Sequence, residues 1–67
     1  MEIEDCTVLR ETERAILVRS EEFDEIEGEI DVWIPKSQID DDSEVYKLKT
    51  EGTLIVTEWF AEQKGWL

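Results

Sequence analysis

Two runs near the start of the chain have hydrophobic positions spaced as in β-strands. The first covers residues 3–11, IEDCTVLRE, and its side chains divide between two faces: Ile3, Thr7 and Leu9 on one, Cys6 and Val8 on the other. The second, residues 15–19, is a short run of aliphatic side chains, AILVR. Both patterns predict strands. A tight turn at Thr12-Glu13 between them predicts a hairpin.

The clearest alternation of apolar and polar residues lies at 29–35, EIDVWIP. It predicts a strand with Ile30, Val32 and Ile34 on one face and with Asp31 and Trp33 on the other. Pro35 should end this strand because proline cannot donate to a sheet ladder. We expect the next residues, 36–39, to form a tight helical turn that returns Ile39 to the core.

The polar connection at 20–28 contains two apolar residues, Phe23 and Ile26, spaced by three. A single helical turn would place both on the core, and a loop with two inward anchors would also do so. Both alternatives stay open at this point.

The last third of the chain predicts two more strands and a helix. A short strand is expected at 45–48, a turn at Glu51-Gly52, and a further strand at 53–57 with Leu54 and Val56 opposite Ile55. Thr57 is a favourable N-cap for a helix that ends before Gly65, a typical C′ residue, so that Trp66 can pack back over its last turn.

Together these elements predict one domain, residues 1–67, of the mainly-β class. We expect a small antiparallel barrel of four to five strands with a short C-terminal helix. The stretch DVWIPKSQID at 31–40 resembles the strand-to-turn step of S1-type OB domains. An SH3-like barrel fits the pattern equally well, so both topologies stay open.

Composition supports a folded chain and limits its chemistry. Hydrophobic residues make up 40% of the 67 positions and three of them are Trp, which argues against disorder. Cys6 is the single cysteine and there is no histidine, so an intrachain disulfide is excluded and a zinc site is not expected. We expect Cys6 to be a buried residue of a reducing compartment. The acidic N-terminus and the lack of a long apolar run predict a soluble intracellular protein.

Catalysis and dedicated cofactors are not expected. Without histidine the usual general base is missing, and the glycines form no phosphate-binding loop. Asp40, Asp42 and Glu44 alternate as calcium ligands do, but the glycine of a calcium loop is missing after them. We therefore predict a protein that is not an enzyme and that holds no cofactor or metal.

Charge is the strongest functional clue. Nineteen acidic and seven basic residues give a net charge of −12. Solubility alone needs a magnitude of about 2 to 8 in a small domain. The acidic residues form two clusters: Glu21, Glu22, Asp24, Glu25, Glu27, Glu29 and Asp31 in the first, and Asp40, Asp41, Asp42 and Glu44 in the second.

These clusters have two interpretations. They are either solvated loops or a surface that binds a basic partner protein. In the second case Trp33 is a candidate anchor, because Trp is favoured at interfaces; alternatively Trp33 packs beneath the C-terminal helix. Direct binding of nucleic acid would need a basic groove beside the aromatic residues Trp33, Tyr46, Trp59 and Trp66. The lysines near them are outnumbered by acids.

The segments WIPKSQI (33–39) and TEWFAEQKGW (57–66) resemble a group of small proteins encoded by phages and prophages. This resemblance implies an origin in a phage-related gene and action in the cytoplasm of a bacterial host. As a class, small acidic phage proteins are similar to inhibitors of host defence, including anti-CRISPR proteins and DNA mimics. The favoured hypothesis is therefore an acidic inhibitor of a host defence protein. The alternatives are a single-stranded-DNA-binding accessory of phage DNA metabolism and a structural homo-oligomer, such as a homodimer.

Overall fold

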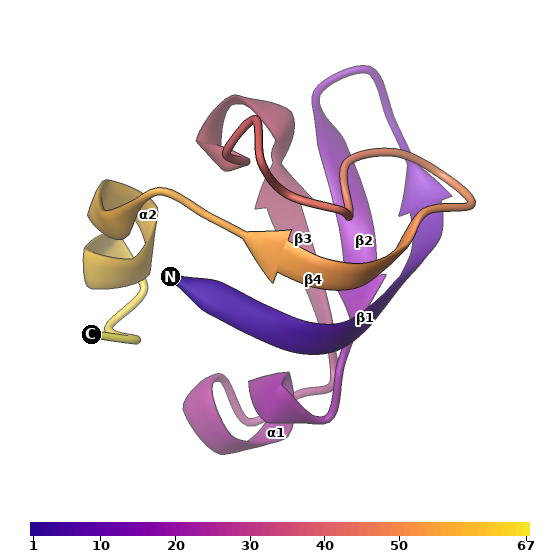
Figure 1. Cartoon of the computed structure of the whole chain (residues 1–67). Coiled ribbons are helices and arrows are strands. Elements are labelled where there is room, and N and C mark those ends of the chain that lie inside the picture. The colour runs from indigo at the N-terminus through magenta and orange to yellow at the C-terminus, as the bar shows by residue number, and fades with distance from the viewer.

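A computed structural model describes all 67 residues as a mainly-β fold with short helices. The four strands form one antiparallel sheet in the order β3-β2-β1-β4 (Figure 1). In chain order, the elements are β1 (Glu2–Glu11), β2 (Ala15–Arg19), α1 (Glu22–Ile26), β3 (Asp31–Pro35), the 3₁₀ turn η1 (Lys36–Gln38), β4 (Glu51–Ile55) and α2 (Glu58–Gln63). The predicted fold class and the hairpin of the first two strands are confirmed.

The long strand β1 joins both halves of the sheet, and a bulge bends it. Ile3 pairs with Leu54 and Cys6 with Gly52, so two residues, Glu4 and Asp5, lie opposite one residue of β4. Asp5 has a φ of 54°. Because of the inserted residue, Ile3 and Cys6 both face the core, and the predicted assignment of Ile3 to the opposite face is wrong.

The sheet does not close, but its two edges approach each other beyond β3 and β4. Ile39 forms an antiparallel bridge with Val56. The backbone N–H of Asp40 donates to the Ile55 carbonyl (2.8 Å), and that of Thr57 donates to the Gln38 carbonyl (3.0 Å). The result is a partly open, barrel-like fold, while the choice between SH3-like and OB-like topology stays a prediction.

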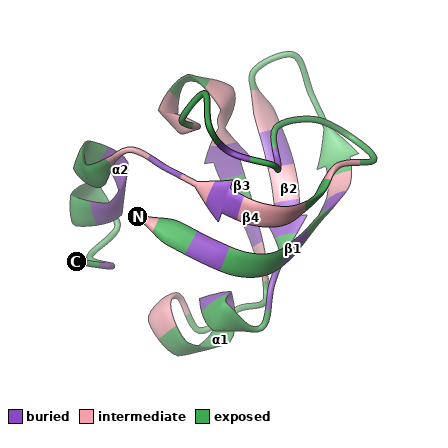
Figure 2. Cartoon of the chain, viewed as in Figure 1, coloured by how far each residue is buried: buried purple, intermediate pink, exposed green.

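The core contains the buried apolar side chains of all four strands, and α1 contributes to it (Figure 2). Phe23 is completely buried and Ile26 packs against the core, so the helical alternative for residues 20–28 is correct. The predicted tight turn after Pro35 is confirmed as η1, and Ile39 packs against the core behind it.

The C-terminal helix begins and ends as predicted. The Thr57 hydroxyl oxygen accepts the N–H of Phe60, and the Trp66 and Gly65 N–H groups donate to the carbonyls of Ala61 and Glu62. These last two bonds form a Schellman motif. The ring centroid of Trp66 lies 5.5 Å from the ring centroid of Phe23 and 5.6 Å from that of Phe60. Trp66 therefore joins the end of α2 to α1.

Two predictions for the segment before β4 are wrong. Residues 45–48 belong to a loop, because the Thr50 hydroxyl accepts the N–H groups of Tyr46 and Lys47 and Lys49 has a φ of 74°. The turn therefore lies at 47–50, and Glu51-Gly52 starts β4.

A third prediction, for the strand at 29–35, needs a correction at its start. β3 begins only at Asp31, and the side chain of Ile30 is 42% exposed instead of sharing the buried face of Val32 and Ile34.

Candidate protein-binding surface

The first acidic cluster gathers on and around α1, with most of its carboxylates free. Glu21, Glu22, Asp24, Glu25 and Glu29 are exposed. Apart from Glu22, none of these side chains takes part in a hydrogen bond or ion pair within the chain. The helix is anchored by Phe23 on the opposite side. The fold therefore presents Asp24 and Glu25 to solvent on a helix that Phe23 anchors, with Glu21 and Glu29 beside it.

The β1 bulge adds two acidic residues to this cluster that the sequence reasoning missed. A shallow hollow of about 390 Å³ is lined by Glu4, Asp5, Thr7, Arg19, Ser20, Glu21 and Glu22. The Glu4 N–H donates to Glu22 Oε2, and the Ser20 hydroxyl donates to the Glu4 carbonyl at 2.7 Å. The sequence carries a signal for this arrangement, since Asp is among the residues that tolerate the left-handed backbone that Asp5 adopts in this bulge.

Besides Glu22, two further members of the first cluster make contacts inside the protein. Glu27 accepts the indole N–H of Trp66 at 3.0 Å and pairs with Lys64 at 3.1 Å, and these contacts lower the pKa of its carboxyl. Arg19 Nε and Nη2 donate to the two carboxylate oxygens of Asp31, at 2.7 and 3.0 Å. This ion pair lowers the pKa of the Asp31 carboxyl. Neither residue is a free charge for a partner.

The second cluster also divides into free and engaged carboxylates. Glu44 Oε1 accepts the N–H of Thr53 at 2.9 Å, and Asp40 Oδ1 accepts the N–H of Asp42 at 2.9 Å. Asp41 and Asp42 are exposed and accept no hydrogen bond through their side chains. Asp41 and Asp42 are therefore the free charges of this cluster.

Glu44 belongs to a segment that covers the outer edge of β4. The backbone N–H of Glu44 donates to the Thr53 carbonyl, and the buried Ser43 hydroxyl accepts the N–H of Ile55 at 3.0 Å. These bonds pair backbone N–H and C=O groups that an edge strand would otherwise present to another chain.

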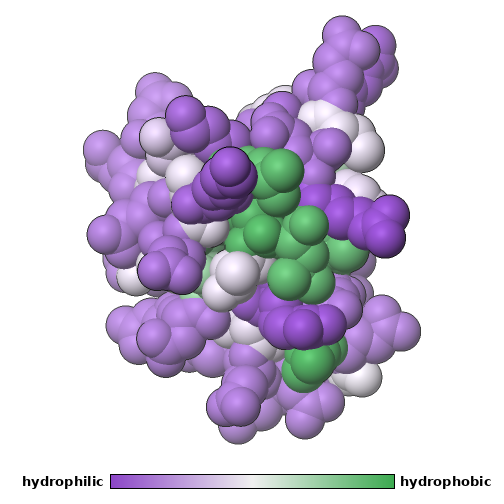
Figure 3. Space-filling model, turned by 90° about the vertical axis from the view of Figure 1, so that its right-hand side faces the viewer, coloured by the Kyte–Doolittle hydropathy of each residue, from purple (hydrophilic) through white to green (hydrophobic).

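Trp33 lies on the outer face of β3. It is 47% exposed, which confirms its predicted orientation away from Val32 and Ile34 and favours the exposed alternative over packing beneath the C-terminal helix. Its neighbour across the sheet is Leu17 of β2. On the side of the molecule that lies to the right in Figure 1, apolar side chains form a patch within a hydrophilic surface (Figure 3).

Other reactive groups offer little chemistry. Burial raises the pKa of the Cys6 thiol to about 11, and the residue is 1% exposed, which confirms its predicted burial. The thiolate, which is the nucleophilic form, is therefore scarce at neutral pH. No group of three or more acidic or cysteine side chains is arranged to hold a metal ion.

The helices are too short and too polar to cross a membrane. Comparisons of the chain with protein families, with curated proteins and with solved structures find no match.

Proposed function

We propose that the chain is an acidic, protein-binding inhibitor that occupies the basic nucleic-acid-binding surface of another protein. The partner class suggested by the resemblance to phage proteins is a host defence protein of a bacterial cell. The observation that carries the proposal is the acidic surface around α1. There, Glu4, Asp5, Glu21 and Glu22 line one hollow whose single cation, Arg19, is paired with Asp31.

Electrostatics favours such a partner. A net charge of −12 repels nucleic acid and attracts a surface built to hold phosphates. Fixing carboxylates on a packed helix also reduces the entropy lost when they meet a partner's cations. Asp24 and Glu25 extend the charged surface along α1.

Direct binding of single-stranded DNA is a weaker second candidate. Trp66, one of the four aromatic residues considered as stacking platforms, is buried, while Trp33, Tyr46 and Trp59 are exposed on different elements. Three of the seven cations, Arg19, Lys36 and Lys64, are paired with carboxylates inside the chain. The remaining cations leave little charge for a phosphate backbone.

The proposal is tested by capture from a nuclease-treated bacterial lysate on the immobilised protein. We expect a nucleic-acid-handling protein that is retained at low salt and released by added double-stranded DNA, because both ligands use the same basic surface. The variant Asp24→Lys/Glu25→Lys should lose this protein, since both side chains are exposed and unpaired.

A matched control is Glu13→Lys/Glu62→Lys, which makes the same change in net charge at exposed positions away from α1. This variant should retain the captured protein. Equal loss with both variants, or capture that DNA does not reverse, would contradict a specific acidic contact surface.

A further inference from the structure

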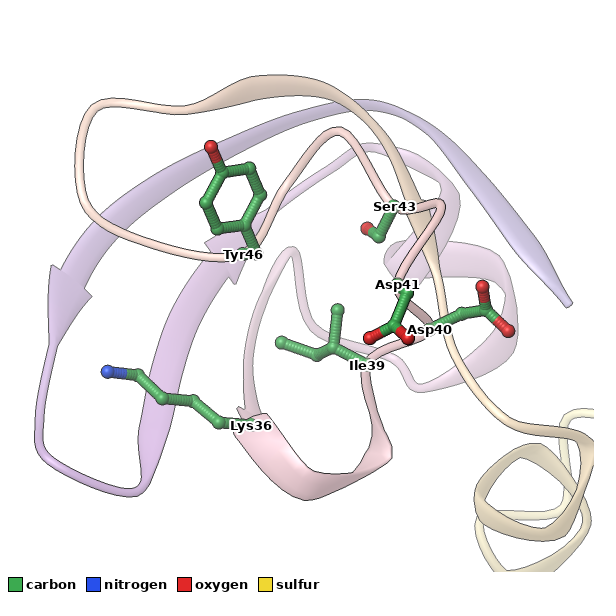
Figure 4. Close-up of a pocket in the computed structure, with 6 residues that line it drawn as sticks. All are labelled: Lys36, Ile39, Asp40, Asp41, Ser43 and Tyr46. Atoms are coloured by element: carbon green, nitrogen blue, oxygen red, sulfur yellow. The ribbon is translucent and has the colours of Figure 1, made fainter.

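A pocket separate from the acidic hollow lies between η1 and the loop that follows it (Figure 4). Its volume is about 410 Å³, and its lining residues are Lys36, Ile39, Asp40, Asp41, Ser43 and Tyr46. The pocket therefore joins an apolar side chain, an aromatic ring and carboxylates in one open recess.

The two ends of this recess differ in charge. Lys36 lines it with its aliphatic chain, while its ammonium group points away from the carboxylates in Figure 4 and is paired with Glu11. Asp40 turns its carboxylate away from Tyr46 and uses one oxygen for the N–H of Asp42. Asp41 accepts no hydrogen bond within the chain and is exposed. The unneutralised charge of the pocket is therefore negative.

The remaining lining is suited to a long, flat cation. The Ile39 side chain points into the space between Tyr46 and Lys36 (Figure 4), where it offers contact to an aliphatic stem. The Ser43 hydroxyl is already occupied, since it donates to the Val45 carbonyl and accepts the N–H of Ile55. The ring of Tyr46, whose residue is 50% exposed, is available for stacking.

Tyr46 already attracts a cation inside this chain. The Lys47 ammonium lies 5.5 Å from its ring centroid, although Lys47 does not line the pocket. Guanidinium groups stack on aromatic rings and bind carboxylates through paired N–H groups, whereas an ammonium group does neither in this way.

We propose that this pocket receives an arginine side chain of a partner protein. The stem packs on Ile39, the guanidinium stacks on Tyr46, and its N–H groups donate to the Asp41 carboxylate. This inference rests on the proposed binding of a basic protein surface and adds a preference for arginine over lysine.

The test is an NMR titration of the ¹⁵N-labelled protein with an acetylated, amidated tri-arginine peptide and, separately, with the corresponding tri-lysine peptide. Tri-arginine should shift the amide signals of residues 39–46 and bind more tightly than tri-lysine. Asp41→Asn and Tyr46→Leu should each weaken tri-arginine binding about two- to fivefold, the usual effect of one exposed charge contact or cation–π contact. Both side chains are exposed, and retained dispersion of the amide signals checks that each variant is folded.

Glu62→Gln is the matched control because it also removes one negative charge, at an exposed position of α2 that does not line the pocket, and it should leave the affinity within about twofold. Equal affinity for the two peptides would overturn the arginine preference. Shifts of the amide signals of residues 21–25 without shifts at 39–46 would contradict arginine binding in the pocket. They would still be consistent with the proposed acidic contact surface around α1. The lysate experiment with the Asp24/Glu25 variant tests that surface independently.

Discussion

The two acidic clusters look alike in the sequence but have different tasks in the structure. Around α1, Glu21, Asp24 and Glu25 point to solvent without partners. In the loop after η1, Glu44 and Asp40 accept backbone N–H groups. The exposed side of α1 therefore carries free charge, whereas the loop uses Glu44 and Asp40 to hold its own backbone in place.

The difference follows from what each backbone needs. In α1, Phe23 supplies the buried side of the helix, so Asp24 and Glu25 make no contact that the fold needs, and only Glu22 accepts a backbone N–H, that of Glu4. The loop runs along the edge of β4, where the N–H groups of Thr53 and Ile55 need acceptors. A carboxylate or hydroxyl of the adjacent loop can supply them. Composition alone therefore does not distinguish a binding surface from a structural cap.

The largest expected effect comes from Gly52, on which the Glu44 side chain lies. Gly52 has a φ of +124°, and a Cβ there would lie 2.7 Å from Glu44 Oε1. Gly52→Ala should lower the free energy of unfolding by about 2–4 kcal/mol, through backbone strain and a displaced hydrogen bond. Denaturant unfolding measures this change.

Gly65→Ala is the control, because its φ is +78° and a Cβ would meet nothing within 4 Å. It should cost about 1 kcal/mol through strain alone. If the two variants lose equal stability, the close approach of Glu44 to β4 does not contribute to the free energy of unfolding.

A smaller effect is expected when the two regions are compared directly. Glu44→Ala should cost about 1 kcal/mol, because the Thr53 N–H loses its acceptor at the sheet edge. Glu25→Ala should stay within about 0.5 kcal/mol, as is usual for an exposed surface position. Thermal unfolding of both variants checks this contrast, and a larger loss for Glu25→Ala would reverse our assignment of roles.

The smallest effect concerns Glu27, the acidic residue that joins α1 to the C-terminus. Contacts with Trp66 and Lys64 lower its pKa in the folded protein, so the unfolded chain takes up the proton first. Its contribution to stability is therefore present at pH 7 and is lost as the pH falls below the ordinary glutamate pKa of about 4.3.

The variant Glu27→Gln should accordingly be less stable at pH 7 by under about 1 kcal/mol, and it should lose less stability than the wild type between pH 7 and pH 3. Glu25→Gln serves as the control for general charge effects. An unchanged pH dependence in Glu27→Gln would show that the Trp66 contact does not depend on the charge of Glu27.

The periodicity of the sequence identified most of the elements. The hairpin of β1 and β2, the turn at η1 and both caps of α2 are where local patterns place them. The wrong face assigned to Ile3 results from a long-range contact, the pairing of β1 with β4 across the bulge, whereas the error at 45–48 results from local hydrogen bonds. The strand expected at 45–48 is a loop because Thr50 folds that segment back.

Among the candidate site residues, position in the sequence did not show which carboxylates are free to contact a partner. Asp31 and Glu27 are paired with Arg19 and with Trp66, partners that lie 12 and 39 residues away in the chain. Conversely, Glu4 and Asp5 join the α1 surface through a bulge that no hydrophobic pattern marks. Such pairings depend on the fold and not on neighbouring residues.

The sequence by itself determined the fold class, the buried face of β3 at Val32 and Ile34, and a net charge that repels nucleic acid. These properties follow from side-chain chemistry and from spacing along the chain, both of which are local. Only the tertiary structure decided which carboxylates remain free and that Ile39, Asp41 and Tyr46 share one pocket. That outcome depends on the path of the loop along β4, because distant backbone N–H groups there compete with solvent and with partners for the same oxygens.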